Sequence, residues 1–245
     1  MKKVQTISRL EKRTKDFYEK IPFPYIESMK KRVDEIYCQE LELKREDFRN
    51  KLLLDAGCGS GLRTDYFREL GATVVPIDLN NTIIKNLKHG KVMSVLNMDF
   101  ENNTYDIVHS CGVLHHTPNP RKGFSECCRV LKKRGTLIVS LLNKQNIVYP
   151  LLYKILRHMI PKKVVWFFWR SAHHLTSNMK TSDEELWASM MDSFYTPVAH
   201  FFSIKEIKRW FKEENITLKK MTGTSFFRFM SMNKRSLIYY VGEKS

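Results

Sequence analysis

The segment Leu52–Thr64, LLLDAGCGSGLRT, constrains the fold more than any other part of this 245-residue chain. Three apolar residues run into Asp55, and Gly57, Gly59 and Gly61 then alternate with small residues. The chain holds only ten glycines, so three within five positions need a reason in the backbone. Glycine tolerates positive φ and lets the main chain approach a ligand closely. The pattern predicts a buried strand that turns into a helix, with backbone N–H groups facing a ligand.

Strands and helices continue to alternate as far as Asn143. The predicted strands cover residues 51–57, 73–78, 91–96, 105–111 and 135–143. The predicted helices between them cover residues 63–71, 81–90 and 120–135. Apolar strands that alternate with helices indicate a parallel sheet covered on both faces. A helix over 203–215, opened by Ser203 and its capping box with Glu206, and two strands over 216–222 and 235–243 close the chain. The expected fold is α/β, a doubly wound, Rossmann-like sheet of seven strands.

Two segments lie outside this alternation. Residues 1–50 read as a charged helical cap, interrupted by the proline-containing stretch IPFPYIE. Residues 144–200 read as about three helices rich in aromatic and basic side chains. We therefore expect a cap over 1–50, a ligand-binding core over 51–143, a helical lid insert over 144–200 after the fifth strand, and the closing elements of the core over 201–245.

Composition limits the partners and the compartment. Lys and Arg exceed Asp and Glu by 42 to 26, a net charge of +16, which favours anionic partners or reflects a lysine-rich proteome. The five cysteines are irregularly spaced and no secretory leader precedes them, so we expect reduced thiols in the cytoplasm. The most apolar long segment, residues 146–160, contains Lys154 and Arg157 and is too short to span a bilayer. Adjacent Cys and His pairs lack ligand spacing, so no metal site is predicted.

A carboxylate follows the glycine turn at a sequence separation that is typical of nucleoside-binding sites. Asp78 ends the second predicted strand, about 20 residues further on, where an acid can hydrogen-bond a ribose diol. The glycine spacing lacks the later glycine of the pyrophosphate fingerprint. The pair therefore describes a site for a nucleoside whose other end need not be a phosphate.

With LLLDAGCGSG, VVPID, YDIVHSCGVLHHTPNP and CCRVLKKRGTLIVSLLN in this order, the chain resembles a class I S-adenosylmethionine-dependent methyltransferase of the methyltransferase domain 11 type. The resemblance covers about residues 51–143 and implies S-adenosyl-L-methionine as cofactor. It implies that the three glycines wrap the amino-acid and ribose parts, that Asp78 binds the ribose hydroxyls, and that Asp55 holds the amino group or anchors the loop. Further cofactor-binding residues that it implies are Cys58, Leu79, Ser110 and Cys111.

The adenine contact has two interpretations. If Phe100 matches the phenylalanine of the family's LPF loop, Asp99 replaces the proline and the adenine lies near Ser94. If the loop is shortened, Asn97 or Asp99 makes the contact. We favour the second interpretation, because an amide or carboxylate oxygen can accept the adenine amino hydrogens.

Candidate catalytic residues follow the fourth strand. Methyl transfer needs an acceptor held in line with the methyl carbon, and an oxygen acceptor also needs a proton removed. His116, and with less support His115, could remove it, although both rings could equally belong to the packing of the fold. Cys111 as a nucleophile lacks the Pro-Cys pair of pyrimidine C5 methylation. The Asn/Asp-Pro-Pro-Tyr signature of exocyclic amino methylation is absent.

The acceptor is expected between the cap and the insert. The candidate substrate-binding residues are Tyr18, Phe23, Tyr25, Tyr149, Tyr153, Arg157, Trp166, Trp169 and Arg170. Their aromatic and basic mixture favours a small-molecule or biosynthetic-intermediate acceptor, anionic or lipid-linked, with peripheral membrane contact as a further option. Two alternatives stay open. The charge of +16 is compatible with an RNA (tRNA) methyltransferase. A protein that has lost catalysis could also serve as a cofactor-binding partner subunit.

Overall fold

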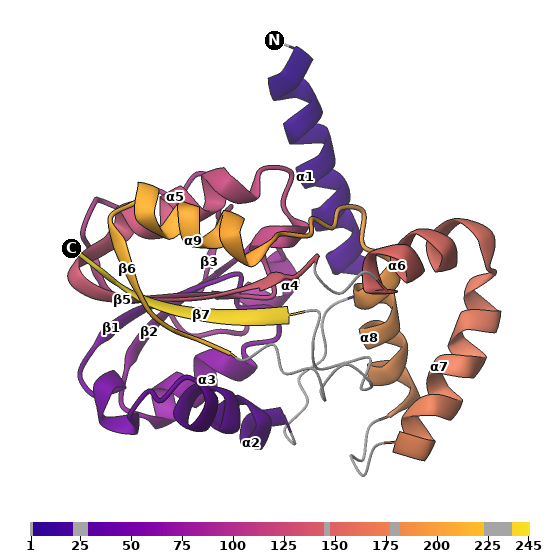
Figure 1. The fold of residues 1–245 in the computed structure, drawn as a ribbon, viewed down its shortest axis with the longest axis horizontal. Helices are drawn as coiled ribbons and strands as arrows, with labels where there is room; N and C mark the ends of the chain where they lie inside the picture. Colours follow the sequence, from indigo (N-terminus) through magenta and orange to yellow (C-terminus); the bar gives the residue numbers. More distant parts are fainter. Residues whose placement is uncertain (1, 22–28, 145–147, 177–181, 223–236) are drawn as a thin grey trace.

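The computed structural model describes residues 2–21, 29–144, 148–176, 182–222 and 237–245 (Figure 1). Its centre is a seven-stranded sheet in the order β3-β2-β1-β4-β5-β7-β6. The strands are β1 (Leu52–Ala56), β2 (Thr73–Asp78), β3 (Lys91–Val92), β4 (Tyr105–Cys111), β5 (Leu131–Leu142), β6 (Ile216–Met221) and β7 (Leu237–Lys244). β1 to β5 pair in parallel, and β7 is inserted antiparallel between β5 and β6. The predicted doubly wound, seven-stranded fold is confirmed.

Helices cover both faces of the sheet. The α-helices are α1 (Lys2–Lys20), α2 (Met29–Asp34), α3 (Leu62–Glu69), α4 (Asn81–Ile84), α5 (Pro120–Val130), α6 (Val148–Met159), α7 (Lys162–Thr176), α8 (Asp183–Tyr195) and α9 (Ile204–Glu213). Short π and 3-10 turns occupy Glu35–Glu40, Arg45–Phe48 and Leu114–His116. In Figure 1, α5 and α9 lie on one face of the sheet and α2 and α3 on the other. Leu54 packs in the cluster with α5 and α9, and Leu53 in the cluster with α2 and α3, so alternate side chains of β1 feed both halves of the core.

The glycine turn adopts the backbone that its sequence predicts. Gly57, Gly59 and Gly61 have φ values of +85°, +52° and +86°, in the left-handed region. The N–H groups of Gly57 and Cys58 donate to the carbonyl oxygen of Ile77 at 2.8 and 3.0 Å, which ties the turn to β2. Gly61 is the N-cap residue of α3, so the chain passes from β1 into the helix within a few residues.

Some predicted boundaries are wrong. The helix expected over 120–135 ends at Val130, because Leu131 already pairs with Tyr105 of β4 and Arg134 has a positive φ of 58°. The helix expected over 81–90 covers only Asn81–Ile84, and the strand expected over 91–96 only Lys91–Val92. Ser203 caps α9 as predicted, accepting the N–H of Glu206 at 3.2 Å.

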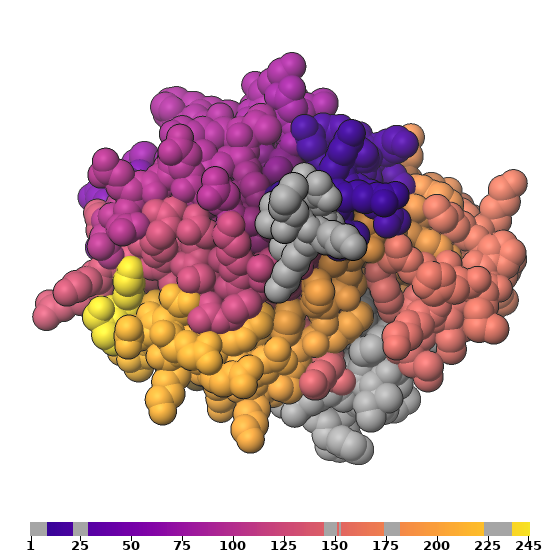
Figure 2. Space-filling model, turned by 90° about the horizontal axis from the view of Figure 1, so that it is seen from above, coloured from indigo at the N-terminus to yellow at the C-terminus, as the bar shows by residue number. Residues whose placement is uncertain are grey.

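The helices α6–α8 lie beside the end of the sheet where β5 finishes, and α1 runs down towards them from above (Figure 1). From the perpendicular view, α1, in indigo, lies between the magenta core and the orange insert (Figure 2). Phe17 and Ile21 from the N-terminal segment pack against a cluster from the insert that includes Val165 and Met190. Cap and insert, far apart in the sequence, therefore meet. Among the described residues, no helix combines the length and apolarity needed to cross a membrane.

Candidate active site

The centre of the site is the contact between the glycine turn and Asp78. The backbone N–H of Gly59 donates to Oδ2 of Asp78 at 3.0 Å, and the N–H of Asn80 donates to Oδ1 at 2.9 Å. Burial raises the pKa of the Asp78 carboxyl, and the two backbone donors oppose that shift. The carboxylate is thus held at the end of β2, directly beside the turn, with lone pairs left for hydroxyl donors.

The three glycines serve different purposes. A Cβ atom on Gly57 would lie 2.4 Å from Val113 Cγ2, and one on Gly61 would lie 2.7 Å from Leu87 Cδ2. A Cβ on Gly59 would meet nothing within 4 Å. Packing therefore explains two of the glycines, whereas Gly59 borders open space beside Asp78. A nucleoside ligand with a ribose diol fits there, because this backbone leaves room for it and the carboxylate accepts its hydroxyl hydrogens.

Both carboxylate oxygens of Asp55 contact other side chains of the protein. Its carboxyl is buried and accepts the hydroxyl of Thr64 at 2.6 Å on Oδ2, while Oδ1 lies 2.8 Å from Nδ1 of His109. Of the two roles considered for Asp55, this geometry favours the loop anchor over a direct contact with the donor amino group.

His109 is a functional-site neighbour that sequence reasoning missed. Nε2 of His109 lies 2.6 Å from the hydroxyl of Tyr37, so an Asp55–His109–Tyr37 chain crosses the core below the glycine turn. Burial disfavours the charged ring, but the Cys111 thiol and the Asp55 carboxylate raise the pKa of His109 to about 9. The signal was present in the sequence, since a histidine in the middle of the apolar strand YDIVHSC needs polar partners.

The other residues that the sequence predicts around the donor differ in the burial of their side chains. The hydroxyl of Ser110 donates to the Ala56 carbonyl at 2.9 Å, and Cys111 is buried with its thiol 3.9 Å from the Ile138 carbonyl. Both side chains are therefore buried and engaged with main-chain carbonyl groups of the protein. Cys58 is buried within the turn, and Leu79 directly follows Asp78 at half exposure.

The loop after β3 carries the three candidates for the adenine contact. Asn97 and Asp99 are exposed. Ser94 is half-buried, and its hydroxyl donates to Glu11 of α1 and accepts the N–H of Leu96 at 3.1 Å. The preference for Asn97 or Asp99 therefore stays a prediction, with Ser94 already engaged by the cap.

His115 and His116 lie on the 3-10 turn after β4, and their environments differ. Burial lowers the pKa of His115 well below its usual range, and its Nδ1 atom has no hydrogen-bond partner. Nδ1 of His116 lies 2.8 Å from the carbonyl oxygen of Val198. A carbonyl only accepts, so the neutral His116 ring carries its proton on Nδ1 and leaves Nε2 as a proton acceptor. Geometry thus supports His116 over His115 as a base.

Tyr18 joins the cap, the core and the insert. Its hydroxyl donates to Oδ1 of Asp192 in α8 at 2.8 Å, and its carbonyl accepts the side-chain amide of Asn80 at 2.9 Å. Its ring lies edge-on to His116, with centroids 6.3 Å apart. Asn80, which the sequence analysis overlooked, is buried and also caps α4. Of the predicted acceptor residues, Tyr18 is the one that these contacts bring next to both Asp78 and His116.

Tyr153 and Arg157 of α6 hold a main-chain segment. The hydroxyl of Tyr153 donates to the Thr196 carbonyl at 2.8 Å, and Arg157 donates to the same carbonyl and to the Tyr153 hydroxyl. That segment continues to Val198, whose carbonyl holds His116. The two side chains therefore support the candidate base through the backbone that they fix.

The remaining predicted acceptor residues have other surroundings. Trp166 and Trp169 pack inside the insert, against Trp187 and Phe194 respectively. Arg170 is exposed and pairs with Asp183 at 2.7 Å. Phe23 and Tyr25 lie outside the described residues, as does the side chain of Tyr149. No group of three or more His, Cys, Asp or Glu able to hold a metal ion occurs in the described part of the chain.

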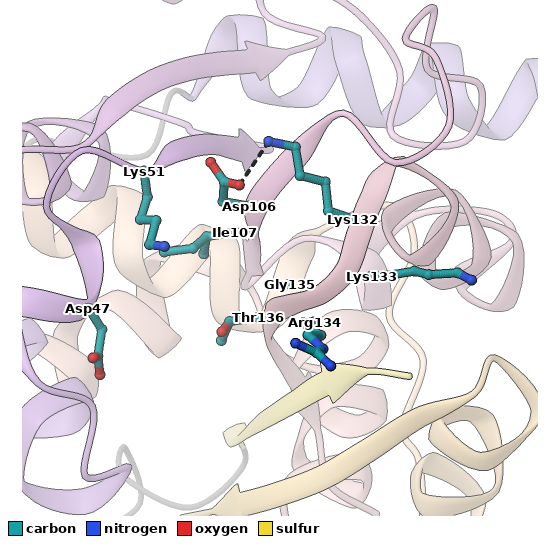
Figure 3. Close-up of a pocket in the computed structure, with 9 residues that line it drawn as sticks. All are labelled: Asp47, Lys51, Asp106, Ile107, Lys132, Lys133, Arg134, Gly135 and Thr136. Atoms are coloured by element: carbon teal, nitrogen blue, oxygen red, sulfur yellow. Dashed lines mark hydrogen bonds and ion pairs between the residues drawn. The ribbon is translucent and has the colours of Figure 1, made fainter.

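A hollow of about 250 Å³ lies at the opposite edge of the sheet. Figure 3 shows its lining from the starts of β1, β4 and β5, with Lys132 reaching Asp106 at 2.8 Å and Lys133 turned away. In open parallel sheets, ligands bind beyond the carboxyl ends of the strands. The hollow is at the amino ends, so the site at Asp78 is separate from it.

The sheet order is that of the class I S-adenosylmethionine-dependent methyltransferase fold, and the glycine turn and Asp78 lie together where the sequence predicts a nucleoside site. Residues 54–139 match the family model of the methyltransferase domain. This part of the chain is thus similar to the methyltransferase domain, in agreement with the resemblance that its sequence motifs indicated.

Three known proteins illustrate the similarity. An uncharacterized protein of Methanocaldococcus jannaschii is 35% identical over 145 residues, 56% of this chain and 64% of that protein. A ubiquinone biosynthesis O-methyltransferase of Xanthomonas oryzae is 29% identical over 157 residues, 58% of this chain and 62% of that protein. The structure of a Synechocystis magnesium protoporphyrin IX methyltransferase with bound S-adenosylmethionine superposes with a TM-score of 0.53 at 14% identity, over 88% of this chain and 79% of that one. The matched region thus spans under two thirds of both sequence relatives.

Proposed function

We propose that the protein transfers a methyl group from S-adenosylmethionine to an oxygen of a small-molecule or biosynthetic-intermediate acceptor that is anionic or lipid-linked. The observation that carries the proposal is Tyr18, which connects Asn80 beside the donor site to Asp192 of the insert. Residues 1–50 and 144–200 act, in this proposal, as a cap and a lid over the core of 51–143 and 201–245. A site closed by two helical segments favours a small acceptor over a nucleic-acid duplex.

The residues of the core would hold the donor. Asp78 accepts the ribose hydroxyls, and Gly59 leaves the space that the ribose and amino-acid parts need. When bound, S-adenosylmethionine supplies an electrophilic methyl group on a sulfonium centre. The protein's task is then to orient the acceptor oxygen and to exclude water around it.

His116 takes the proton in this proposal. Its Nδ1–H is fixed by the Val198 carbonyl, so Nε2 is the atom that accepts a proton from the acceptor hydroxyl. Tyr153 and Arg157 keep the Thr196–Val198 backbone in place and so set the orientation of the imidazole. The relative named as a ubiquinone biosynthesis O-methyltransferase supports an oxygen acceptor on a small molecule.

A lipid-linked acceptor agrees with the outer face of α7. Val164, Phe167 and Phe168 follow helical spacing and are 43%, 66% and 67% exposed, beside exposed Lys162 and Lys163. Apolar side chains flanked by lysines suit the surface of an anionic membrane. Replacing both phenylalanines by serine should abolish sedimentation with phosphatidylglycerol vesicles. Undiminished sedimentation of the variant would remove this face from the proposal.

The experiment that tests the function uses methyl-labelled donor and a cell extract divided into small-molecule, lipid and RNA fractions. Label is expected in the small-molecule or lipid fraction, and the Asp78→Ala protein, which should bind the donor more weakly, is the control and should transfer less label. Label confined to the RNA fraction would favour the second candidate, an RNA methyltransferase, which the net charge of +16 supports. In that case, binding to bulk transfer RNA should weaken steeply with salt through counterion release. Absence of label everywhere, with donor bound, would favour the inactive partner subunit.

A further inference from the structure

The most unusual charge in the described part of the chain is Arg63. It lies in the first turn of α3, two residues after Gly61. Its Nε atom is fully buried without a hydrogen-bond partner, and its guanidinium makes one long contact, 3.4 Å from Nη2 to the Tyr239 hydroxyl. A guanidinium stays charged at any physiological pH, and leaving it buried without an anion opposes folding.

Among the described residues, the Asp55 carboxylate interacts with the charge of Arg63, but no ion pair or hydrogen bond joins the two side chains. Tyr37, Tyr239 and Cys111 are the side chains that interact most with its charge. The nearest structural acid on the neighbouring strand, Asp55, has both oxygens occupied by Thr64 and His109. The guanidinium of Arg63 thus keeps N–H donors that no side chain of the described residues accepts, so they are available to a ligand.

The position of Arg63 indicates which kind of ligand group its guanidinium would bind. Cys111, its neighbour, is the last residue of β4, so the guanidinium lies at the carboxyl edge of the sheet. The N–H groups of the first turn of α3 have no partner within the helix, and the positive end of the helix dipole points the same way. Arg63 and the helix N-terminus therefore both lie directly after the glycine turn in the first turn of α3. A planar, forked donor of this kind matches a carboxylate.

We propose that Arg63 binds the carboxylate of the amino-acid part of the donor, at the end of the site opposite Asp78. The assignment rests on the proposed function only in placing the donor at this turn. Asp78 would hold the ribose and Arg63 the carboxylate, so the two charged residues fix the molecule at both ends of its sugar–amino-acid portion.

Two ligands that differ in this one group test the proposal by calorimetry. S-adenosylhomocysteine carries the carboxylate, and 5′-methylthioadenosine is the same thioether nucleoside without the amino-acid part. Arg63→Met should weaken S-adenosylhomocysteine about 10- to 100-fold and leave 5′-methylthioadenosine within about twofold. Arg68→Met, in the last turn of the same helix and paired with Asp65 at 3.4 Å, is the matched control and should change neither affinity.

A stability measurement separates ligand binding from a structural role. Because the Nε atom of Arg63 is buried without a hydrogen-bond partner and no ion pair holds the guanidinium in the described residues, the ligand-free Arg63→Met protein should melt at or above the wild-type temperature. Equal weakening of both ligands, or no weakening of either, would overturn the proposal. If Arg63→Met does not fold, Arg63→Lys, which keeps the charge without the fork, replaces it and must still weaken only S-adenosylhomocysteine. A wild-type protein that binds neither ligand would instead refute the proposed function.

Discussion

Nδ1 of His116 lies 2.8 Å from the carbonyl oxygen of Val198, a residue that follows α8 at the end of the insert. The contact links the turn after β4, which carries the proposed base, to a segment 82 residues further along the chain. It also fixes the tautomer, since the carbonyl can only accept. The insert therefore contacts the candidate base through its backbone.

Replacing the base tests this role. His116→Asn keeps an N–H that can reach the Val198 carbonyl but offers no ring nitrogen for a proton. With an oxygen acceptor, kcat should fall about 10²- to 10⁴-fold, and calorimetry should show unchanged affinity for S-adenosylhomocysteine. A variant with wild-type kcat would show that the acceptor needs no base from His116.

Substitutions of two arginines in the insert distinguish a role in positioning His116 from the mere loss of a surface charge. Arg157→Met removes the donors to the Thr196 carbonyl and the Tyr153 hydroxyl, so the backbone that holds His116 should shift and kcat should fall about 10- to 100-fold. Arg170→Met removes an exposed ion pair to Asp183 and should leave kcat unchanged. Equal effects of the two substitutions in steady-state kinetics would contradict the positioning role of Arg157.

The glycine turn predicts a contrast between two alanine variants. Gly57 and Gly59 both have positive φ, so an alanine at either position carries a backbone strain of roughly 1–2 kcal/mol. Gly57→Ala adds a clash with Val113 and should lose about 1–3 kcal/mol more in urea unfolding. Gly59→Ala projects into open space and should spare stability beyond the strain while weakening S-adenosylhomocysteine at least about tenfold. Full affinity in Gly59→Ala would mean that the donor does not lie against this residue.

The buried hydrogen-bonded side chains Asp55, His109 and Tyr37 predict how the stability of the fold depends on pH. The Cys111 thiol and the Asp55 carboxylate raise the pKa of His109 to about 9 in the folded protein, against about 6.5 when unfolded. A raised pKa stabilises the fold fully below pH 6.5, and the contribution is lost as the pH rises through 9.

His109→Gln measures that contribution. The difference in unfolding free energy between wild type and His109→Gln should shrink by about 3 kcal/mol between pH 6.5 and 9, with Asp55 and His109 counted as one pair. His158→Gln, at an exposed position in α6, is the control substitution. If the His109→Gln difference is also independent of pH, the ring is neutral in the folded protein.

The sequence predicted the sheet and the backbone of the glycine turn well because both depend on local patterns. Alternating apolar strands and helices indicate a parallel, doubly wound sheet, and the Gly-x-Gly-x-Gly spacing is tied to the positive φ values at Gly57, Gly59 and Gly61. The roles of Tyr153, Arg157 and Trp169 depend on which face of each helix meets the core, and composition alone does not give that. His109 and Arg63 were overlooked because their partners come from elements distant in the sequence, Tyr37 and Tyr239 among them.

The central claim is that Asp78 and the glycine turn bind the donor nucleoside, and calorimetric titration with S-adenosylhomocysteine tests it most directly. Asp78→Ala should weaken binding by about 1.5–3 kcal/mol, the loss of charge-assisted hydrogen bonds to the ribose, or roughly 10- to 150-fold. Asp65→Ala, on the half-exposed side of α3, should bind as the wild type does. Wild-type affinity in a folded Asp78→Ala protein would contradict the account.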